Sequence, residues 1–249
     1  MRTSALVFLA ASLLFGCSAQ NDKGHGAKNA EYYYSLAVNS YYDQNAQLAL
    51  RELDTCFKMD PKLAKAHHLA GLIFLGRKEY ADSLYHLEEA TKLDERYTEA
   101  RANLGALYIA MSNWQKAIEL LTPIARNPVY PTPYLVENNL GWAYFKMGKL
   151  TQAENHLKRA LFLNDKMCLA YNNIGIVHRE QGRMEDALDD FEAAIARCPH
   201  FVEPYFRAGA LLERSSRFAE ATKRFKKCKR LGGDSVYGRR CKRKLQALK

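Results

Sequence analysis

The chain has 249 residues, 48% of them hydrophobic and only seven of them proline, so it can bury a sizeable core as one or two domains or as one elongated array. One apolar run lies near the N-terminus and no second long one follows, which argues against a membrane-embedded fold for the remainder. The formal net charge of +10 is distributed unevenly along the chain.

The first residues have the pattern of an export signal. Arg2 precedes a nearly continuous apolar run over residues 5–15, which is too short to cross a bilayer as a helix. The sequence LFGC at residues 14–17 resembles the bacterial lipobox, although Phe15 departs from the small residues usual there. We expect residues 1–16 to be a lipoprotein signal peptide and Cys17 to be the lipidated residue. The alternative is an ordinary signal peptide with a chance cysteine.

Residues 17–29 (CSAQNDKGHGAKN) then form a polar, glycine-containing stretch that is predicted to be a flexible, lipidated tether. Fully extended, its twelve residues after Cys17 reach roughly 40 Å. The lipobox resemblance implies three acyl chains, palmitate among them, and several chains give stable attachment. Ser18 stands where aspartate would favour the inner membrane, so the resemblance implies a lipid anchor in the outer membrane, facing the periplasm.

The remainder of the chain repeats itself with a period near 34 residues. Six equivalent small residues are separated by 34, 34, 36, 34 and 34 positions. A second small residue follows each of them by twelve positions, and a large apolar residue follows by sixteen. The three sets are Ala37, Gly71, Gly105, Gly141, Gly175 and Gly209; Ala49, Ser83, Ala117, Ala153, Ala187 and Ala221; and Leu53, Leu87, Leu121, Leu157, Phe191 and Phe225.

This pattern resembles the tetratricopeptide (TPR) repeat, a helix–turn–helix unit of 34 residues. Small residues allow two antiparallel helices to approach closely, and the large residue fills the gap between them. The predicted fold is therefore all-α, a TPR superhelical solenoid of six repeats over residues 30–233. Residues 234–249 are predicted to be a basic C-terminal capping helix, as solenoids require at their ends.

One stretch breaks the pattern. Residues 122–133 (TPIARNPVYPTP) contain Pro123 and three further prolines between the third and fourth repeats. Because proline within a helix removes a hydrogen bond and clashes with the preceding turn, the second helix of repeat three should end early or kink. The longer, stiff connection that follows is a tolerated surface insertion or, alternatively, a binding loop.

The TPR resemblance also implies a binding surface, because the first helix of each repeat lines a concave groove in that family. Repeats one to four place apolar and aromatic residues there, and repeats five and six place charged ones. Exposed apolar surface marks binding sites, and aromatic residues are favoured anchors. The predicted partner-binding residues are Tyr34, Val38, Tyr41, Tyr42, Leu72, Leu75, Ile109, Trp142 and Phe145. The alternative for each is that it only packs against the next repeat.

Asparagine recurs at the sixth position of three repeats, as Asn103, Asn139 and Asn173. In some TPR proteins this residue helps to clamp a peptide carboxylate. Because asparagine is ordinary TPR consensus there and the matching Lys and Arg are not found, these residues are interpreted as structural.

Positive charge is concentrated in the last part of the chain. Residues 217–249 hold thirteen Lys or Arg against Glu220 and Asp234. Export excludes nucleic acid as the partner, which leaves anionic lipid headgroups, the cell wall or a simply solvated surface.

Four cysteines lie where antiparallel helices bring them together. Cys168 begins the first helix of repeat five and Cys198 ends its second helix, so a disulfide is plausible in an oxidising compartment. Cys228 and Cys241 could similarly join the cap to repeat six; free thiols are the alternative for both pairs. Cys56 occupies a small, buried repeat position.

Sequence motifs for catalysis are missing: there is no HExxH, GxSxG, GxxxxGK[ST] or CxxC. Adjacent His67 and His68 point about 100° apart on a helix, which is poor geometry for one metal. We therefore expect no enzymatic activity, no cofactor, no metal and no small-molecule substrate.

A lipidated TPR array facing the periplasm resembles the secretin pilotins of type IV pilus biogenesis, the PilF/PilW/Tgl family. The resemblance implies that the groove binds a secretin subunit, and that the anchor promotes its outer-membrane localisation and multimer assembly, which pilus-dependent motility requires. The alternative on the same fold is a lipoprotein scaffold for peptidoglycan hydrolases or synthases. A membrane-anchored enzyme would need a site that the sequence does not show.

Overall fold

The computed structural model describes residues 29–248, and every element in this part of the chain is a helix or a turn. The predicted signal peptide, Cys17 and residues 17–28 of the tether lie outside the described residues. Asn29 begins the described part, where its side chain accepts a hydrogen bond from the Tyr32 amide and so caps the first helix.

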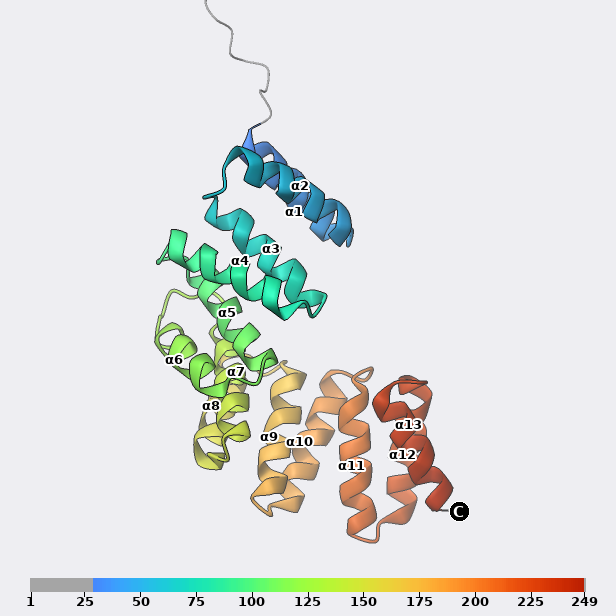
Figure 1. The fold of residues 1–249 in the computed structure, drawn as a ribbon. Coiled ribbons are helices and arrows are strands. Elements are labelled where there is room, and N and C mark those ends of the chain that lie inside the picture. The colour runs from blue at the N-terminus through green and yellow to red at the C-terminus, as the bar shows by residue number, and fades with distance from the viewer. Residues whose placement is uncertain (1–28, 249) are drawn as a thin grey trace, which may run out of the picture.

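Thirteen helices follow one another in this part of the chain, and the first twelve form six antiparallel pairs, here called units 1 to 6 (Figure 1). The pairs are α1 (Ala30–Tyr42) with α2 (Ala46–Met59), α3 (Ala64–Gly76) with α4 (Tyr80–Leu93), α5 (Thr98–Ala110) with α6 (Trp114–Ala125), α7 (Pro133–Lys146) with α8 (Leu150–Leu163), α9 (Cys168–Glu180) with α10 (Met184–Arg197), and α11 (Val202–Arg214) with α12 (Phe218–Gly232). The thirteenth helix, α13 (Val236–Ala247), follows α12. The predicted all-α TPR solenoid is confirmed.

The repeated glycines are required by the close packing within units 2 to 6. A Cβ at Gly71 would lie 2.6 Å from Leu87 Cγ, and one at Gly175 would lie 2.8 Å from Phe191 Cε1. Leu87 and Phe191 are fully buried, so neither has free space into which it could move. The small residue and the large residue sixteen positions later therefore form one packing contact in each unit.

Each unit turns at the same place. The second residue after the first helix has a positive φ in all six units: Gln44, Lys78, Ser112, Gly148, Gly182 and Ser216. This left-handed conformation ends the helix and reverses the chain. Units 4 and 5 use glycine there, whereas the other four units place a larger residue in a region that glycine adopts more easily.

The proline-rich stretch shortens a helix as expected. Helix α6 contains Pro123 and has 12 residues, whereas α2, α4, α8 and α10 have 14 each. Residues 126–132 then connect α6 to α7, which begins at Pro133. Neighbouring units still pack closely here: contact between units is most extensive between α6 and α7 and least extensive between α2 and α3.

Helix α13 covers the apolar face that unit 6 would otherwise expose. Its buried Cys241 belongs to a cluster with Tyr205, Phe225 and Cys228, and Leu245 packs against the same cluster. The Ser235 hydroxyl caps the start of α13 by accepting a hydrogen bond from the Gly238 amide. The helix thus performs the role of the predicted capping helix.

Candidate protein-binding groove

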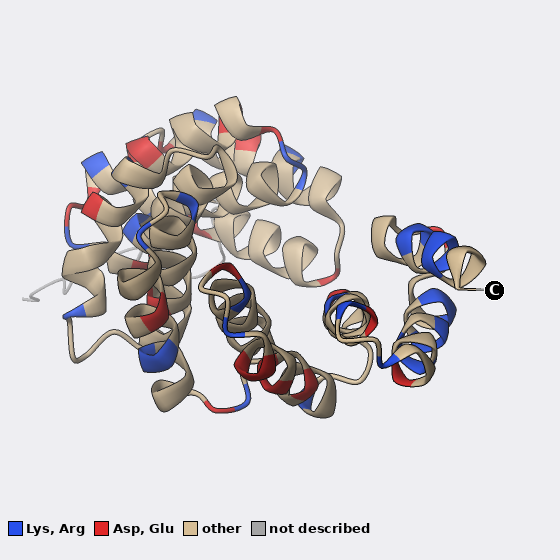
Figure 2. Cartoon of the chain, turned by 90° about the horizontal axis from the view of Figure 1, so that it is seen from below, with Lys and Arg blue, Asp and Glu red and all other residues tan. Residues whose placement is uncertain are grey.

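The first helices of the units line the inner side of the superhelix. Helix α1 contacts α3, α3 contacts α5, α5 contacts α7 and α7 contacts α9, so these helices approach one another across the units. Helix α13 contacts α11 in the same way. Figure 2 shows the array curving around this inner side. Side chains that point inward from these helices line a groove.

At the N-terminal end of the groove, only some of the predicted aromatic side chains are exposed to solvent. Tyr41 and Tyr42 are 36% and 77% exposed. Tyr34 and Val38 are half-buried and pack against the core of units 1 and 2. Lys65 Nζ lies 4.7 Å from the centre of the Tyr34 ring, and burial raises the pKa of Tyr34 despite this nearby cation.

The next part of the groove contains a polar chain of side chains. Asn103 Nδ2 donates to His68 Nε2 at 2.8 Å, so a neutral His68 carries its proton on Nδ1 and donates it to the Tyr97 hydroxyl at 2.7 Å. Burial lowers the pKa of His68 and raises the pKa of Tyr97 to about 12, which keeps both groups neutral. Asn103 is therefore structural, as interpreted from the sequence.

Leu72 and Leu75 are half-buried, and Leu75 packs against a cluster around Leu87 and Leu104 of units 2 and 3. Ala102 of α5 and Ile176 of α9, which also lie on first helices, are buried. Tertiary packing has thus removed some inward-facing positions from the accessible surface.

A hollow of about 520 Å³ opens farther along the groove, between helices of units 3 to 6 and α13. Its lining residues are mainly polar: Ile109, Asn138, Asn139, Trp142, Lys146, Leu169, Asn172, Asn173, Glu203, Arg207 and Tyr237. We call it the central hollow. It brings together two of the nine predicted groove residues, Ile109 and Trp142, and Phe145 stacks on Trp142 with ring centres 5.1 Å apart.

Two neighbouring asparagines of the central hollow differ in their hydrogen bonding. Asn173 Nδ2 donates to Asn138 Oδ1 at 3.0 Å, which fixes α9 against α7. Asn172 is only 1% exposed, yet its Oδ1 has no hydrogen-bond partner among the described residues. A buried acceptor without a partner costs free energy.

The charged groups of the central hollow come from two helices, α7 and α11. Lys146 Nζ lies over the Trp142 ring, 4.8 Å from its centre. Arg207 Nε donates to Glu203 Oε1 at 2.7 Å, and Arg207 Nη2 also reaches the Tyr237 hydroxyl at 3.4 Å. Lys146 has no carboxylate partner among the described residues.

The superhelix brings Lys146 and Arg207 into the same hollow as Asn138 and Asn172, although the sequence shows no Lys and Arg at the positions of a carboxylate clamp. The paired asparagines at residues 138–139 and 172–173 were the sequence signal for this site. The contribution of Tyr237 could not be predicted, because it depends on how α13 docks on α11.

The charged floor expected in units 5 and 6 is largely neutralised within the protein. Lys244 of α13 pairs with Glu213 at 2.5 Å, and Arg179 pairs with its neighbour Glu180 at 2.5 Å. The groove therefore offers amide and aromatic groups rather than a strongly charged strip. Such groups can hydrogen-bond the main chain of an extended segment and contact its apolar side chains.

Two disulfides stabilise the C-terminal half of the array. The structure joins Cys168 to Cys198 across the ends of α9 and α10, and Cys228 to Cys241 between α12 and α13. Cys56 is a buried free thiol. In residues 29–248, no group of three or more His, Cys, Asp or Glu side chains is placed to hold a metal ion. No helix in this range is long and apolar enough to cross a membrane.

Comparison with known proteins begins with the repeats themselves. Family models described as tetratricopeptide repeats match residues 74–128 and residues 138–200. The type IV pilus assembly protein PilF of Pseudomonas aeruginosa is 28% identical over 169 residues, a match covering 65% of this chain and 66% of PilF. Human superkiller complex protein 3 is 22% identical over 204 residues, but the match spans only 13% of its length. The chain thus spans no more than two thirds of these relatives.

Solved structures show the same fold. The crystal structure of PilW, a widely conserved type IV pilus biogenesis factor, matches with a TM-score of 0.77 at 19% identity, covering 88% of this chain and 97% of PilW. The structure of Pseudomonas aeruginosa PilF matches with a TM-score of 0.73 over the same shares of the two chains. The chain is therefore a tetratricopeptide-repeat protein, homologous to PilF and with the fold of PilW.

Proposed function

We propose that this protein is a pilotin: a non-enzymatic TPR adaptor that binds a secretin subunit in its groove and promotes secretin assembly for type IV pilus biogenesis. The observation that carries the proposal is the likeness to PilF and PilW, which covers 88% of this chain and 97% of each solved relative. That likeness supports a role in pilus biogenesis and a protein as partner. Secretin is the partner that such a role most directly requires.

The groove chemistry is consistent with capturing a segment of an unassembled subunit. Tyr41 and Tyr42 offer exposed aromatic surface near one end, and Trp142 with Phe145 offers stacked rings beside the central hollow. A partner segment covered in this way would be kept from aggregating until it joins other subunits.

The proposal includes an anchor at Cys17, which would hold the groove near the periplasmic face of the outer membrane. Several acyl chains make such attachment stable, whereas one chain gives only reversible binding. The anchor delivers the captured subunit to the membrane in which the secretin assembles, and pilus-dependent motility follows from the completed secretin.

The test is a gel of heat-resistant secretin multimers from cells that lack the gene, complemented with wild type, with Cys17→Ala, or with Tyr41→Ala/Trp142→Ala. Multimers should disappear without the gene and return only with wild type. The Cys17→Ala strain should capture secretin but fail to deliver it. Unchanged secretin multimers in the deletion strain would contradict the proposal. If the deletion instead changed cell-wall cross-linking, that result would support the alternative, a scaffold for peptidoglycan hydrolases or synthases.

A matched control separates groove binding from general loss of aromatic surface. Tyr85 on α4 and Phe162 on α8 are 59% and 88% exposed, and both lie on second helices rather than on the groove helices. The Tyr85→Ala/Phe162→Ala variant should restore multimers as wild type does. Circular dichroism melting of both double variants verifies that each array remains folded.

A further inference from the structure

Helices α12 and α13 present matching stripes of positive charge. Lys226, Lys229 and Arg230 are exposed on α12, and Arg239, Lys242 and Arg243 are exposed on α13. Within each stripe the residues are three and four positions apart, which places them on one side of their helix. We call these six residues the basic face. Figure 2 shows Lys and Arg gathered on these two helices.

The charges of the basic face are not neutralised within the protein. None of its six residues forms a salt bridge in the part of the chain that the structure describes, although Arg239 donates a hydrogen bond to the Asp234 carbonyl oxygen. By contrast, nearby Arg224 binds Glu192 through two hydrogen bonds of 2.6 and 2.8 Å. Unpaired like charges repel one another, and an external anion would remove that repulsion.

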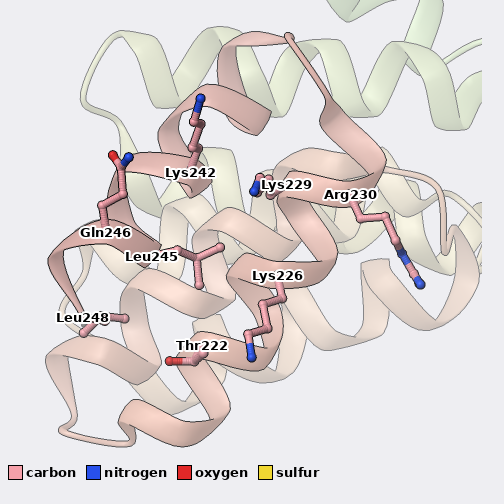
Figure 3. A pocket seen from close by; sticks show the side chains of 8 residues that line it. All are labelled: Thr222, Lys226, Lys229, Arg230, Lys242, Leu245, Gln246 and Leu248. Carbon is pink, nitrogen blue, oxygen red and sulfur yellow. The ribbon is translucent and has the colours of Figure 1, made fainter.

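The two stripes border adjoining hollows. One hollow of about 650 Å³ is lined by Lys226, Lys229, Arg230 and Lys242, with Leu245 and Leu248 among its apolar lining (Figure 3). A second hollow of about 660 Å³ shares Lys229 and Lys242 with the first and adds Arg239 and Arg243. Lys229 and Lys242 therefore lie between the two hollows, where charge from both helices meets.

A disulfide holds the stripes in this arrangement. Cys228 directly precedes Lys229 and Cys241 directly precedes Lys242, and the two cysteines are joined with their Cα atoms 6.1 Å apart. The bond therefore fixes the two central lysines of the basic face relative to each other. Surface charges held in position lose less conformational entropy on binding than charges on separate, mobile helices.

We propose that the basic face docks this end of the array on a bilayer surface that contains anionic phospholipid. Six cations on two adjoining helices match the size of clusters that bind anionic headgroups, and the leucines between them suit the boundary between headgroups and acyl chains. Lysine and arginine stems can reach phosphates while lying along apolar surface. The basic face has no aromatic side chain on which nucleic-acid bases could stack. This inference does not depend on the proposed function.

The test measures binding to vesicles by flotation of the purified chain without residues 1–16, carrying Cys17→Ala, so that neither the apolar N-terminal run nor an acyl anchor contributes. Vesicles of phosphatidylcholine alone are compared with vesicles containing one third phosphatidylglycerol, at low and high salt. Binding should require phosphatidylglycerol and weaken at high salt, because exposed charges are screened. Lys229→Glu/Lys242→Glu should weaken binding by about tenfold or more.

The matched control is Lys62→Glu/Lys166→Glu, which makes the same change in net charge at exposed lysines of other units. It should bind vesicles within about twofold of the parent protein. Cys228→Ser/Cys241→Ser should bind a few-fold more weakly while remaining folded by circular dichroism.

Three results would overturn the inference: equal binding to both vesicle types, equal loss in the control and the basic-face variants, or binding to polyglutamate with none to anionic vesicles. The last result would identify an acidic protein as the partner of this face. If the Cys228→Ser/Cys241→Ser variant loses both vesicle binding and its helical circular dichroism signal, unfolding explains its loss of binding. The Lys229→Glu/Lys242→Glu variant, which keeps the disulfide, then decides the test.

Discussion

Asn173 of α9 donates a hydrogen bond from Nδ2 to Oδ1 of Asn138 on α7 at 3.0 Å, and both side chains are buried. The two residues are 35 positions apart in the sequence, so this bond joins equivalent helices of successive units. It gives one asparagine of the central hollow a structural role. The adjacent Asn172 makes no such bond, because its buried Oδ1 has no hydrogen-bond partner within the described residues.

We predict that Asn173→Ala lowers the free energy of unfolding by about 1–3 kcal/mol, because it leaves Asn138 Oδ1 buried without its donor. Asn172→Ala should cost less than about 1 kcal/mol, since its Oδ1 makes no bond that could be lost. Urea unfolding of the two variants measures the difference. A larger loss for Asn172→Ala than for Asn173→Ala would contradict these assignments.

Two glycines of α3 should respond in opposite directions to alanine. Gly71→Ala should destabilise the protein by about 1–3 kcal/mol, because the new methyl group would lie 2.6 Å from Leu87 Cγ in a filled core. Gly76→Ala meets no atom within 4 Å and replaces glycine in a helix, so it should be neutral or stabilising by up to about 1 kcal/mol. Thermal melting of the pair is the measurement. Similar melting temperatures would show that the close packing within unit 2 is not needed.

Removal of the disulfides should cost stability in the order of the loops they close. The Cys168–Cys198 bond spans 30 residues and the Cys228–Cys241 bond spans 13. On the chain-entropy account their removal costs about 3.5 and about 3 kcal/mol. Urea unfolding of Cys168→Ala/Cys198→Ala and Cys228→Ala/Cys241→Ala, each with the other bond intact, measures both values. A wild-type protein that unfolds identically with and without reductant would contradict this expectation.

Acidification should weaken the interface between units 1 and 2. His86 lies 3.0 Å from His67 between their Nδ1 atoms and stacks on Phe57 and Phe74. Burial, together with His67, lowers the pKa of His86 to about 4, against the opposing effect of Asp82. Below pH 6.5 the unfolded chain therefore binds a proton that the folded chain does not, so stability is lost as pH falls from 6.5 towards 4.

Between pH 7 and pH 5 the loss from His86 should be about 1 kcal/mol, after allowance for its partial exposure. His86→Gln cannot titrate, so its free energy of unfolding should change less over this interval. Urea unfolding at both pH values tests the difference. An equal pH dependence in wild type and variant would assign the effect to other groups.

The fold was predictable because its packing rule is local. The step of sixteen residues from Gly175 to Phe191 recurs in every unit, and each recurrence describes the same contact between two helices of one pair. The shortened α6 followed in the same way from Pro123. These features depend on neighbours that lie close in the sequence.

The candidate site was only partly predictable, because its exposure depends on how successive units stack. Tyr41 and Tyr42 remain open, whereas Tyr34 and Val38 are half-buried by packing that their repeat positions do not reveal. The central hollow depends on the superhelical turn, which brings residues of several units together. The remaining predicted groove residues stay predictions until a partner is tested.

The sequence also did not predict that non-glycine residues would adopt the left-handed conformation in four of the turns. Gln44 and Lys78 adopt φ values of 60° and 63° at the position where Gly148 and Gly182 stand in later units. The repeat alignment identifies the position, but only the backbone shows that all six units use the same conformation.

The sparse contact between α2 and α3 has a consequence for dynamics. In an array whose units contact only their neighbours, local unfolding of unit 1 breaks the fewest contacts with another unit. Both disulfides lie far from unit 1, in units 5 and 6 and α13. Amide protons of α1 and α2 should therefore exchange with solvent faster than those of α9 and α10. A partner that spans α1 and α3 would slow this exchange, so hydrogen–deuterium exchange could detect arrival of the partner as ordering of unit 1.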